Sequence, residues 1–338
     1  MAEALRQTGA EVDWVFSGRP ADKLFDMNDF GDFRVLKGLT FTVRKGRIDA
    51  FSTLKQAPLL QLWRDIRQLD LESYDLILSD YEPVVAWAAR RAGRECIGIG
   101  HQYAFAHDVH KAGHNPVSEA LMRWFAPVSL GLGVHWHHYD ATILPPIIEP
   151  VEVLSSGEPQ TILVYLPFED AQAVMTLLQS FKDWRFIVHS DQVAQGHHAN
   201  VEVKGFSRDG FKASLARSSR VICNAGFELA SEALALGKGL LVKPVLGQME
   251  QVSNALALTE LGLGASMMDL DRAKVEAFLH ASTPVQVTYP NVAQNLAYWL
   301  TSGREEPIER LVQRLWSSVD YQHSPSTVPT SNYHTLSI

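Results

Sequence analysis

Short apolar runs alternate with longer amphipathic segments along most of the chain. The apolar runs are 3 to 6 residues long and fall at 74–78, 95–98, 161–166, 185–189 and 221–223. Runs of this kind are typical of strands that are buried in a parallel sheet. Segments with apolar residues at every third or fourth position predict helices at 59–71, 84–92, 115–124, 170–181, 227–236, 271–279, 291–300 and 307–316. Strands that alternate with helices predict an α/β fold.

The pattern restarts after a proline-containing segment at 144–150 and a turn at 155–159. Because such segments separate domains, we expect one domain at 1–148 and another at 149–300, each large enough to bury a core. A further helix is expected at 301–316. Residues 317–338 are rich in Ser, Thr and Pro, which predicts a disordered tail.

The stretch 221–255 has the most informative pattern. A strand at 221–223 precedes a turn at 224–226, a helix that stops at Gly237, and a second strand at 239–242. This order predicts a βαβ unit with parallel strands. Ligands of such sheets bind beyond the carboxyl ends of the strands. Two polar clusters, at 224–226 and 247–251, are expected at that edge.

These clusters suit a phosphorylated ligand that carries a ribose. Gly226 leaves room for a close approach of the backbone, and the amides that open the next helix point at whatever lies there. Glu232 lies on the same helix, and a carboxylate can accept both hydroxyls of a ribose. The alternative is that Glu232 is a solvated helical side chain.

The spacing of the polar positions resembles the donor-site signature of GT-B glycosyltransferases. The pattern contains Asn224, Gly226, Glu232, Gly237, Pro244, Glu250, Gln251, Asn254 and Ala255 in order. It is most similar to the UDP-glucuronosyltransferases and to the family 28 transferase that adds GlcNAc in the synthesis of lipid II. Three features depart from that pattern. Leu229 replaces a Ser or Thr, the loop between Pro244 and Glu250 is longer, and residues 167–169 replace a glycine-rich loop.

The resemblance implies a GT-B fold, with two doubly wound, Rossmann-like domains that face a cleft and a last helix that crosses back to the first domain. It also implies inverting transfer of a hexose from a UDP-sugar to an acceptor hydroxyl, with no bound metal or other cofactor. In this reading Gly226 binds the diphosphate, Glu232 the ribose and Phe206 the base. The remaining donor-side residues are Ser207, Asn224, Gln248, Glu250, Gln251 and Asn254.

Polar residues also follow two consecutive strands of the first domain. Asp80, Glu82 and Gln102 are expected near one another at the carboxyl edge of its sheet, where the resembled family binds the acceptor. His101 is the candidate general base, because imidazole can accept a hydroxyl proton near neutral pH. The alternative is a loop histidine that bonds to the backbone. The usual base of the resembled family follows the first strand in a G-x-G-H loop, and residues 1–9 look like the helix after that loop, so we expect the chain to lack it.

Composition and charge argue against several other classes of protein. The net charge of −8 gives no general attraction to nucleic acid, and the two cysteines, 127 positions apart, indicate no disulfide framework. No signal peptide is recognisable, so a cytoplasmic protein is expected. The acceptor could be a sugar, a lipid-linked group or a small molecule, which leaves a peripheral contact with the inner face of a membrane open. His135 and His137 would share one face of a strand, but no acid or cysteine nearby completes a metal site.

Two alternative functions remain open at this point. One is a protein that binds nucleotide sugars without transferring them, because the usual base loop is missing. The other is an enzyme like the UDP-GlcNAc 2-epimerase, which has the same architecture and would release UDP without an acceptor. Fold alone does not separate these functions.

Overall fold

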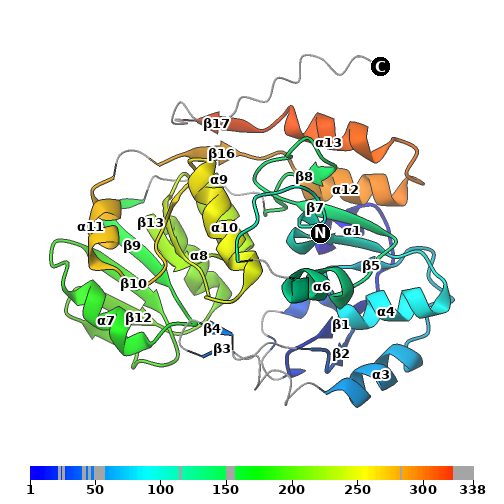
Figure 1. Ribbon diagram of the computed structural model, residues 1–338, viewed down its shortest axis with the longest axis horizontal. Helices are drawn as coiled ribbons and strands as arrows, with labels where there is room; N and C mark the ends of the chain where they lie inside the picture. Colours follow the sequence, from blue (N-terminus) through cyan, green and yellow to red (C-terminus); the bar gives the residue numbers. More distant parts are fainter. Residues whose placement is uncertain are drawn as a thin grey trace. The chain divides into compact units, whose positions relative to one another are not determined.

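The computed structural model describes residues 1–21, 24, 27–39, 43–44, 47–48, 58–113, 116–149, 157–281 and 284–322 (Figure 1). The chain divides into two compact units. The first takes in Met1–Pro150, Gly247–Glu250 and Tyr289–Val319, and the second takes in Val151–Leu246, Gln251–Thr288 and Asp320–Ile338. Within the described residues, every helix falls short of the length and apolar character that a membrane span requires.

The first unit contains short parallel strands and the helices between them. Its elements are α1 (Ala2–Gln7), β1 (Trp14–Ser17), η2 (Met27–Phe30), β2 (Phe33–Leu36), β3 (Val43–Arg44), β4 (Arg47–Ile48), α3 (Leu59–Gln68), β5 (Leu78–Ser79), α4 (Pro83–Ala92), β6 (Ile97–Gly100), α5 (His101–Ala104), α6 (Pro116–Phe125), β7 (Leu130–Val134), β8 (Ile143–Leu144), α12 (Val292–Thr301) and α13 (Ile308–Trp316). Strands β5, β6, β7 and β8 form one parallel sheet in that order, and β1 pairs with β2 in parallel.

Glycines in β6 and β7 allow α5 to pack directly on this sheet. A Cβ atom at Gly133 would lie 2.5 Å from the Cα atom of Ala104, and one at Gly98 would lie within the ring of Tyr103. The alternation Ile-Gly-Ile-Gly in β6 therefore leaves one face of the strand bare. Residues 101–104 were expected in a loop, but they form this short helix because the bare face accepts it.

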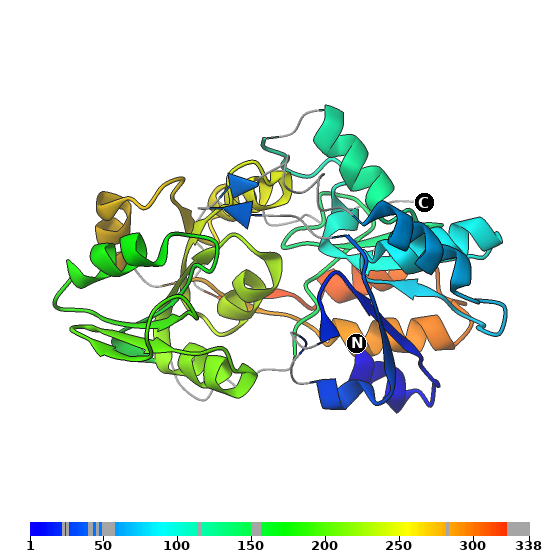
Figure 2. The same ribbon diagram turned by 90° about the horizontal axis from the view of Figure 1, so that it is seen from below.

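The second unit is built on a seven-stranded sheet. Its elements are β9 (Glu158–Tyr165), α7 (Ala171–Gln179), β10 (Arg185–His189), β11 (Gly196–His198), β12 (Val201–Lys204), α8 (Arg208–Arg217), β13 (Ser218–Asn224), α9 (Phe227–Ala235), β14 (Gly239–Lys243), α10 (Met249–Glu260), β15 (Ala265–Ser266), α11 (Arg272–Leu279), β16 (Gln286–Thr288) and β17 (Asp320–Gln322). The strand order is β11-β12-β10-β9-β13-β14-β15, and only the edge strand β11 runs antiparallel to its neighbour. Helices lie on both faces of this sheet (Figure 2).

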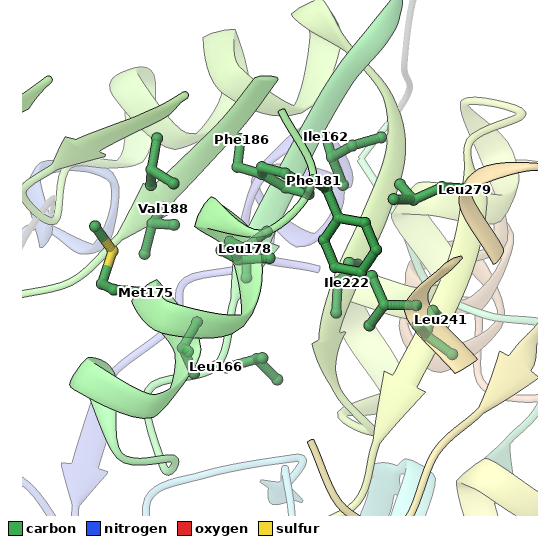
Figure 3. Close-up of a cluster of buried hydrophobic side chains, with 14 of the residues drawn as sticks. Ile162, Leu166, Met175, Leu178, Phe181, Phe186, Val188, Ile222, Leu241 and Leu279 are labelled. Atoms are coloured by element: carbon green, nitrogen blue, oxygen red, sulfur yellow. The ribbon is translucent and has the colours of Figure 1, made fainter. Parts of the chain in front are cut away.

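Alternate residues of the strands form the core of this unit. Ile162, Phe186, Ile222 and Leu241 point from the sheet toward side chains of α7 and α11 (Figure 3). The β-branched and aromatic residues of these strands suit a pleated surface that is buried on both faces. The strand and helix pattern expected from the sequence is therefore present in this unit.

Two expectations about the end of the chain differ from the structure. Residues 320–322 were expected in a disordered tail, but they form β17, which pairs antiparallel with β16. Residues 289–300 were expected in the second domain, but α12 groups with the first unit because Ala297 packs against Ala4 and Leu5 of α1. Residues 323–338 and the boundary segment 150–156 lie outside the described residues.

Candidate functional site

The turn after β13 is the centre of the predicted donor site. The amide of Gly226 donates to the carbonyl of Asn224 (2.8 Å), and α9 begins directly afterwards with Gly226 as its N-cap. Gly226 has no side chain, so it makes no side-chain cap to the helix. A Cβ atom at Gly226 would meet nothing within 4 Å, and its φ of −73° is open to any residue. Neither the backbone conformation nor packing requires glycine here.

Three of the predicted donor residues hold the loops in place. The Asn254 amide donates to the carbonyl of Ala225 (2.9 Å), and the Gln251 side-chain oxygen accepts from the amide of Val245 (2.9 Å). Both side chains are buried. Asn224 is also buried, and its amide nitrogen donates to the carbonyl of Lys243 (2.9 Å). The structure thus brings these residues together around the turn.

The other donor candidates in this region are more accessible. Glu232 lies on α9 and Gln248 precedes α10, and both are half-buried. Glu250 lies in the first turn of α10 and belongs to the first compact unit. Its carboxylate accepts a hydrogen bond from the side-chain amide of Gln102 (3.3 Å), which belongs to the same unit. A residue predicted to bind the donor, Glu250, is therefore hydrogen-bonded to a residue predicted to bind the acceptor, Gln102.

Phe206 and Ser207 follow β12, at the same edge of the sheet as Asn224. Ser207 is the N-cap of α8 and accepts from the amide of Gly210 (3.2 Å). The Phe206 ring is 44% exposed, and its inner edge meets Tyr165 at a centroid distance of 6.2 Å. A large apolar ring that is this exposed beside fixed backbone groups is available for stacking on a ligand.

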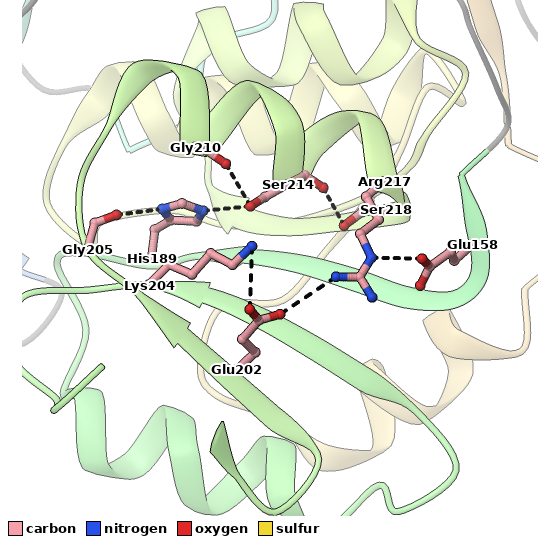
Figure 4. A network of polar contacts seen from close by, with 9 residues as sticks. All are labelled: Glu158, His189, Glu202, Lys204, Gly205, Gly210, Ser214, Arg217 and Ser218. Carbon is pink, nitrogen blue, oxygen red and sulfur yellow. Dashed lines mark hydrogen bonds and ion pairs between the residues drawn. The ribbon is translucent and has the colours of Figure 1, made fainter. Parts of the chain in front are cut away.

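His189 anchors the loop that carries Phe206 (Figure 4). Its Nδ1 lies 3.0 Å from the carbonyl of Gly205, and its Nε2 lies 3.0 Å from the hydroxyl of Ser214. Burial lowers the pKa of His189, so the ring is neutral near pH 7. Since a carbonyl only accepts, Nδ1 carries the proton of the bond to Gly205. The Ser214 hydroxyl beside Nε2 also donates to the carbonyl of Gly210 (2.8 Å). A second group in Figure 4 links Arg217 to Glu158 (2.7 Å) and Glu202 (3.8 Å).

Sequence reasoning missed two charged residues beside the turn. Lys243 ends β14, and its Nζ lies 2.8 Å from Oε1 of Glu169, with side chains only 5% and 6% exposed. The Asn224 amide nitrogen also approaches this carboxylate oxygen (3.4 Å). One signal was present in the sequence, because Lys243 is the only charge in the apolar run 239–245.

The predicted acceptor residues of the first unit lie at two strand ends. A Cβ atom at Gly100 would lie 3.1 Å from Oδ1 of Asp80 and 3.3 Å from Oε1 of Gln102, so these side chains flank the end of β6. Glu82 is the N-cap of α4. Its two oxygens accept from the amides of Val84 (2.9 Å) and Val85 (2.7 Å).

His101, the predicted base, is buried at the start of α5 with 5% of its surface exposed. Its Nδ1 lies 2.9 Å from the carbonyl of Val134, which can only accept. Nδ1 therefore carries the proton, and Nε2 has the lone pair that a general base needs. Its catalytic role stays a prediction.

His135, His137 and His138 lie beyond the strand, because β7 ends at Val134. The Nδ1 atoms of His135, His137 and His138 each accept a backbone amide at 2.9 Å. Burial lowers the pKa of His135 well below its usual value and that of His137 to about 4. In the part of the chain that the structure describes, no three His, Cys, Asp or Glu side chains are grouped so that they could hold a metal ion.

Comparison with known proteins decides the family. Residues 1–283 match the model of the family described as glycosyl transferase family 1. The chain belongs to this family. The predicted resemblance to glycosyltransferases is confirmed.

Solved glycosyltransferases share the fold. LpCGTa, solved in complex with UDP, is 14% identical with a TM-score of 0.56 and covers 93% of this chain and 94% of its own. UGT89C1 of Arabidopsis thaliana, solved with quercetin, is 12% identical with a TM-score of 0.53, and the coverage is 93% and 94%. Spinosyn forosaminyltransferase SpnP is 14% identical with a TM-score of 0.52, and the coverage is 94% and 93%. The expected GT-B fold class is confirmed. A search of curated proteins finds no significant match.

Proposed function

We propose that this glycosyltransferase transfers a hexose from a UDP-sugar to an acceptor hydroxyl, with inversion at the anomeric carbon and without a metal ion. The observation that carries the proposal is the glycine at the N-cap of α9. Gly226 is required neither by its backbone angles nor by packing, and it leaves space beside the first amides of the helix. A diphosphate fits such a place, because the amides and the helix dipole favour negative charge.

The neighbouring residues suit the rest of the donor. We assign Glu232, on the same helix, to the ribose hydroxyls, because a carboxylate can accept hydrogen bonds from both. The exposed ring of Phe206 provides a surface for the base, and His189 holds its loop through the carbonyl of Gly205. Gln248, Glu250 and Gln251 are the candidates for the sugar hydroxyls. The structure of LpCGTa in complex with UDP supports a uridine nucleotide.

The proposed chemistry needs a base and a stabilised leaving group. A base removes the proton of the acceptor hydroxyl, and its oxygen attacks the anomeric carbon from the side opposite the diphosphate. The bond between that carbon and the diphosphate oxygen breaks, and UDP leaves with the electron pair. The α9 amides stabilise the charge that develops on the diphosphate. We assign the base role to Nε2 of His101, and the acceptor contacts to Asp80 and Gln102.

Calorimetric titration with UDP tests the donor site. We expect the wild type to bind UDP and Glu232→Ala to bind it about tenfold more weakly or worse, which corresponds to about 1.4 kcal/mol. Glu228→Ala is the matched control, because Glu228 is an exposed carboxylate on the same helix. Equal binding by wild type and Glu232→Ala would remove the ribose assignment, and no binding by the wild type would remove the donor site.

A second measurement separates transfer from the alternative functions. We expect UDP release from UDP-hexoses to depend on an added acceptor and to continue in EDTA. Release without any acceptor would favour a 2-epimerase-like reaction, and binding with no release under any condition would favour a protein that only binds nucleotide sugars.

A further inference from the structure

Two buried charges lie on either side of the donor-site turn. Strands β9, β13 and β14 are neighbours in the sheet, and Asn224, the last residue of β13, lies in register with Lys243, the last residue of β14. Glu169 follows β9 on the opposite side, one residue before the N-cap of α7. The three loops at the carboxyl edge are thus linked through one cluster of side chains, defined here as the Lys243–Glu169 pair and Asn224.

The pair fixes the orientation of the Asn224 amide. Its nitrogen faces two oxygens, the carbonyl of Lys243 at 2.9 Å and Oε1 of Glu169 at 3.4 Å. A flipped amide would place its own oxygen against both acceptors, so the contacts allow one orientation only. In that orientation Oδ1 of Asn224 is buried without a hydrogen-bond partner. An unsatisfied buried acceptor is costly and calls for a functional or solvent partner.

An ion pair is a poor choice if the only task of these positions is to fill the core. Both charges lose their hydration on burial, and well-packed apolar side chains of similar volume are often at least as stabilising. Binding sites need side chains whose rotamers are fixed by packing and by supporting hydrogen bonds. An ion pair beside a binding turn can provide this support.

We propose that Lys243 and Glu169 are positioning residues of the donor site. This role rests on the proposed UDP-sugar function. The pair fixes the orientation of the Asn224 side chain, and Asn224 in turn fixes the turn that precedes α9. The carbonyl of Ala225 is held from the other side by Asn254 at 2.9 Å. The turn is therefore held at two successive residues, and the α9 amides are fixed in place before the diphosphate arrives.

The test compares UDP binding with stability in variants of the pair. Replacing only one partner leaves a buried charge unpaired, so Lys243→Met and Glu169→Gln are both expected to unfold more easily. The double variant Lys243→Met/Glu169→Met removes both charges and keeps the volume. We expect its thermal unfolding to stay near that of the wild type, while its affinity for UDP falls about tenfold.

Lys238→Met is the matched control. Lys238 immediately precedes β14 at its other end, is equally buried, and donates from Nζ to the carbonyl of Ala216 (3.1 Å). We expect this variant to lose stability and to keep the wild-type affinity for UDP. Equal UDP affinity of the wild type and the double variant would overturn the positioning role and leave the donor site standing. A wild type that binds no UDP would overturn the donor site and the positioning role together.

Discussion

At the scale of single residues, the donor-site signature separates into two groups. Asn224, Gln251 and Asn254 are buried and bond to backbone groups of the loops, whereas Glu232 and Glu250 are half-buried. Ordered spacing in the sequence identified all five, because the signature depends on residue identity and order. It did not distinguish the two groups, because the direction of a side chain depends on the packing of α9 and α10. The sequence pattern did not predict the contact of Glu169 with Lys243, because the two residues are 74 positions apart and meet only in the folded sheet.

Gly226 offers the sharpest residue-scale prediction. Gly226→Ala places a methyl group in the open space beside the α9 amides, where the proposed diphosphate binds. We expect UDP affinity to fall about tenfold, while the free energy of unfolding falls by only about 1 kcal/mol, because alanine is a poorer N-cap than glycine. Gly226→Val should weaken binding further, because the obstruction grows with the side chain. Calorimetry and urea denaturation measure the two quantities, and full UDP affinity in both variants would contradict the proposed site.

At the scale of elements, local pattern predicted the long elements and missed the short ones. The helix α9 and strands β13 and β14 follow from an apolar run, a glycine stop and a second apolar run. The strands β11 and β17 have the sequences GHH and DYQ, which carry no strand pattern, and they are strands because an ordered neighbour offers an edge. The helix α5 depends on bare glycine faces of β6 and β7, which only the packed sheet reveals.

Helix α4 gives the element-scale prediction. Glu82 was predicted to contact the acceptor, but its carboxylate caps two amides of α4 and accepts from the hydroxyl of Ser17 (2.6 Å). We expect Glu82→Ala to lower the free energy of unfolding by about 1–2 kcal/mol, since it removes an N-cap. Chemical denaturation measures this loss, and Glu11→Ala, at an exposed carboxylate of the same unit, should cost less than about 0.5 kcal/mol. A Glu82→Ala protein that keeps its stability but loses transfer would instead favour the acceptor role.

At the scale of the whole molecule, buried histidines make stability depend on pH. Burial lowers the pKa of His107, His135, His137 and His138 in the first unit and of His189 in the second. A histidine with a lowered folded-state pKa binds its proton more readily when the chain is unfolded. The neutral ring is therefore compatible with the fold above the unfolded pKa of about 6.5, and stability is lost as the pH falls below it.

This linkage predicts the pH range over which stability is lost and the unit of the protein that loses it. For His137, the loss should begin near pH 6.5 and end near pH 4, where the folded protein also takes up the proton. Each such histidine contributes up to about 1.4 kcal/mol per pH unit inside its window. Because four of these five histidines lie in the first unit, we expect the first unit to be the more acid-sensitive. Urea denaturation at pH 7, 6, 5 and 4 measures the slope, and His137→Gln should reduce it, because the glutamine does not titrate. Hydrogen exchange locates the loss, and a pH-independent stability, or earlier opening of the second unit, would contradict the prediction.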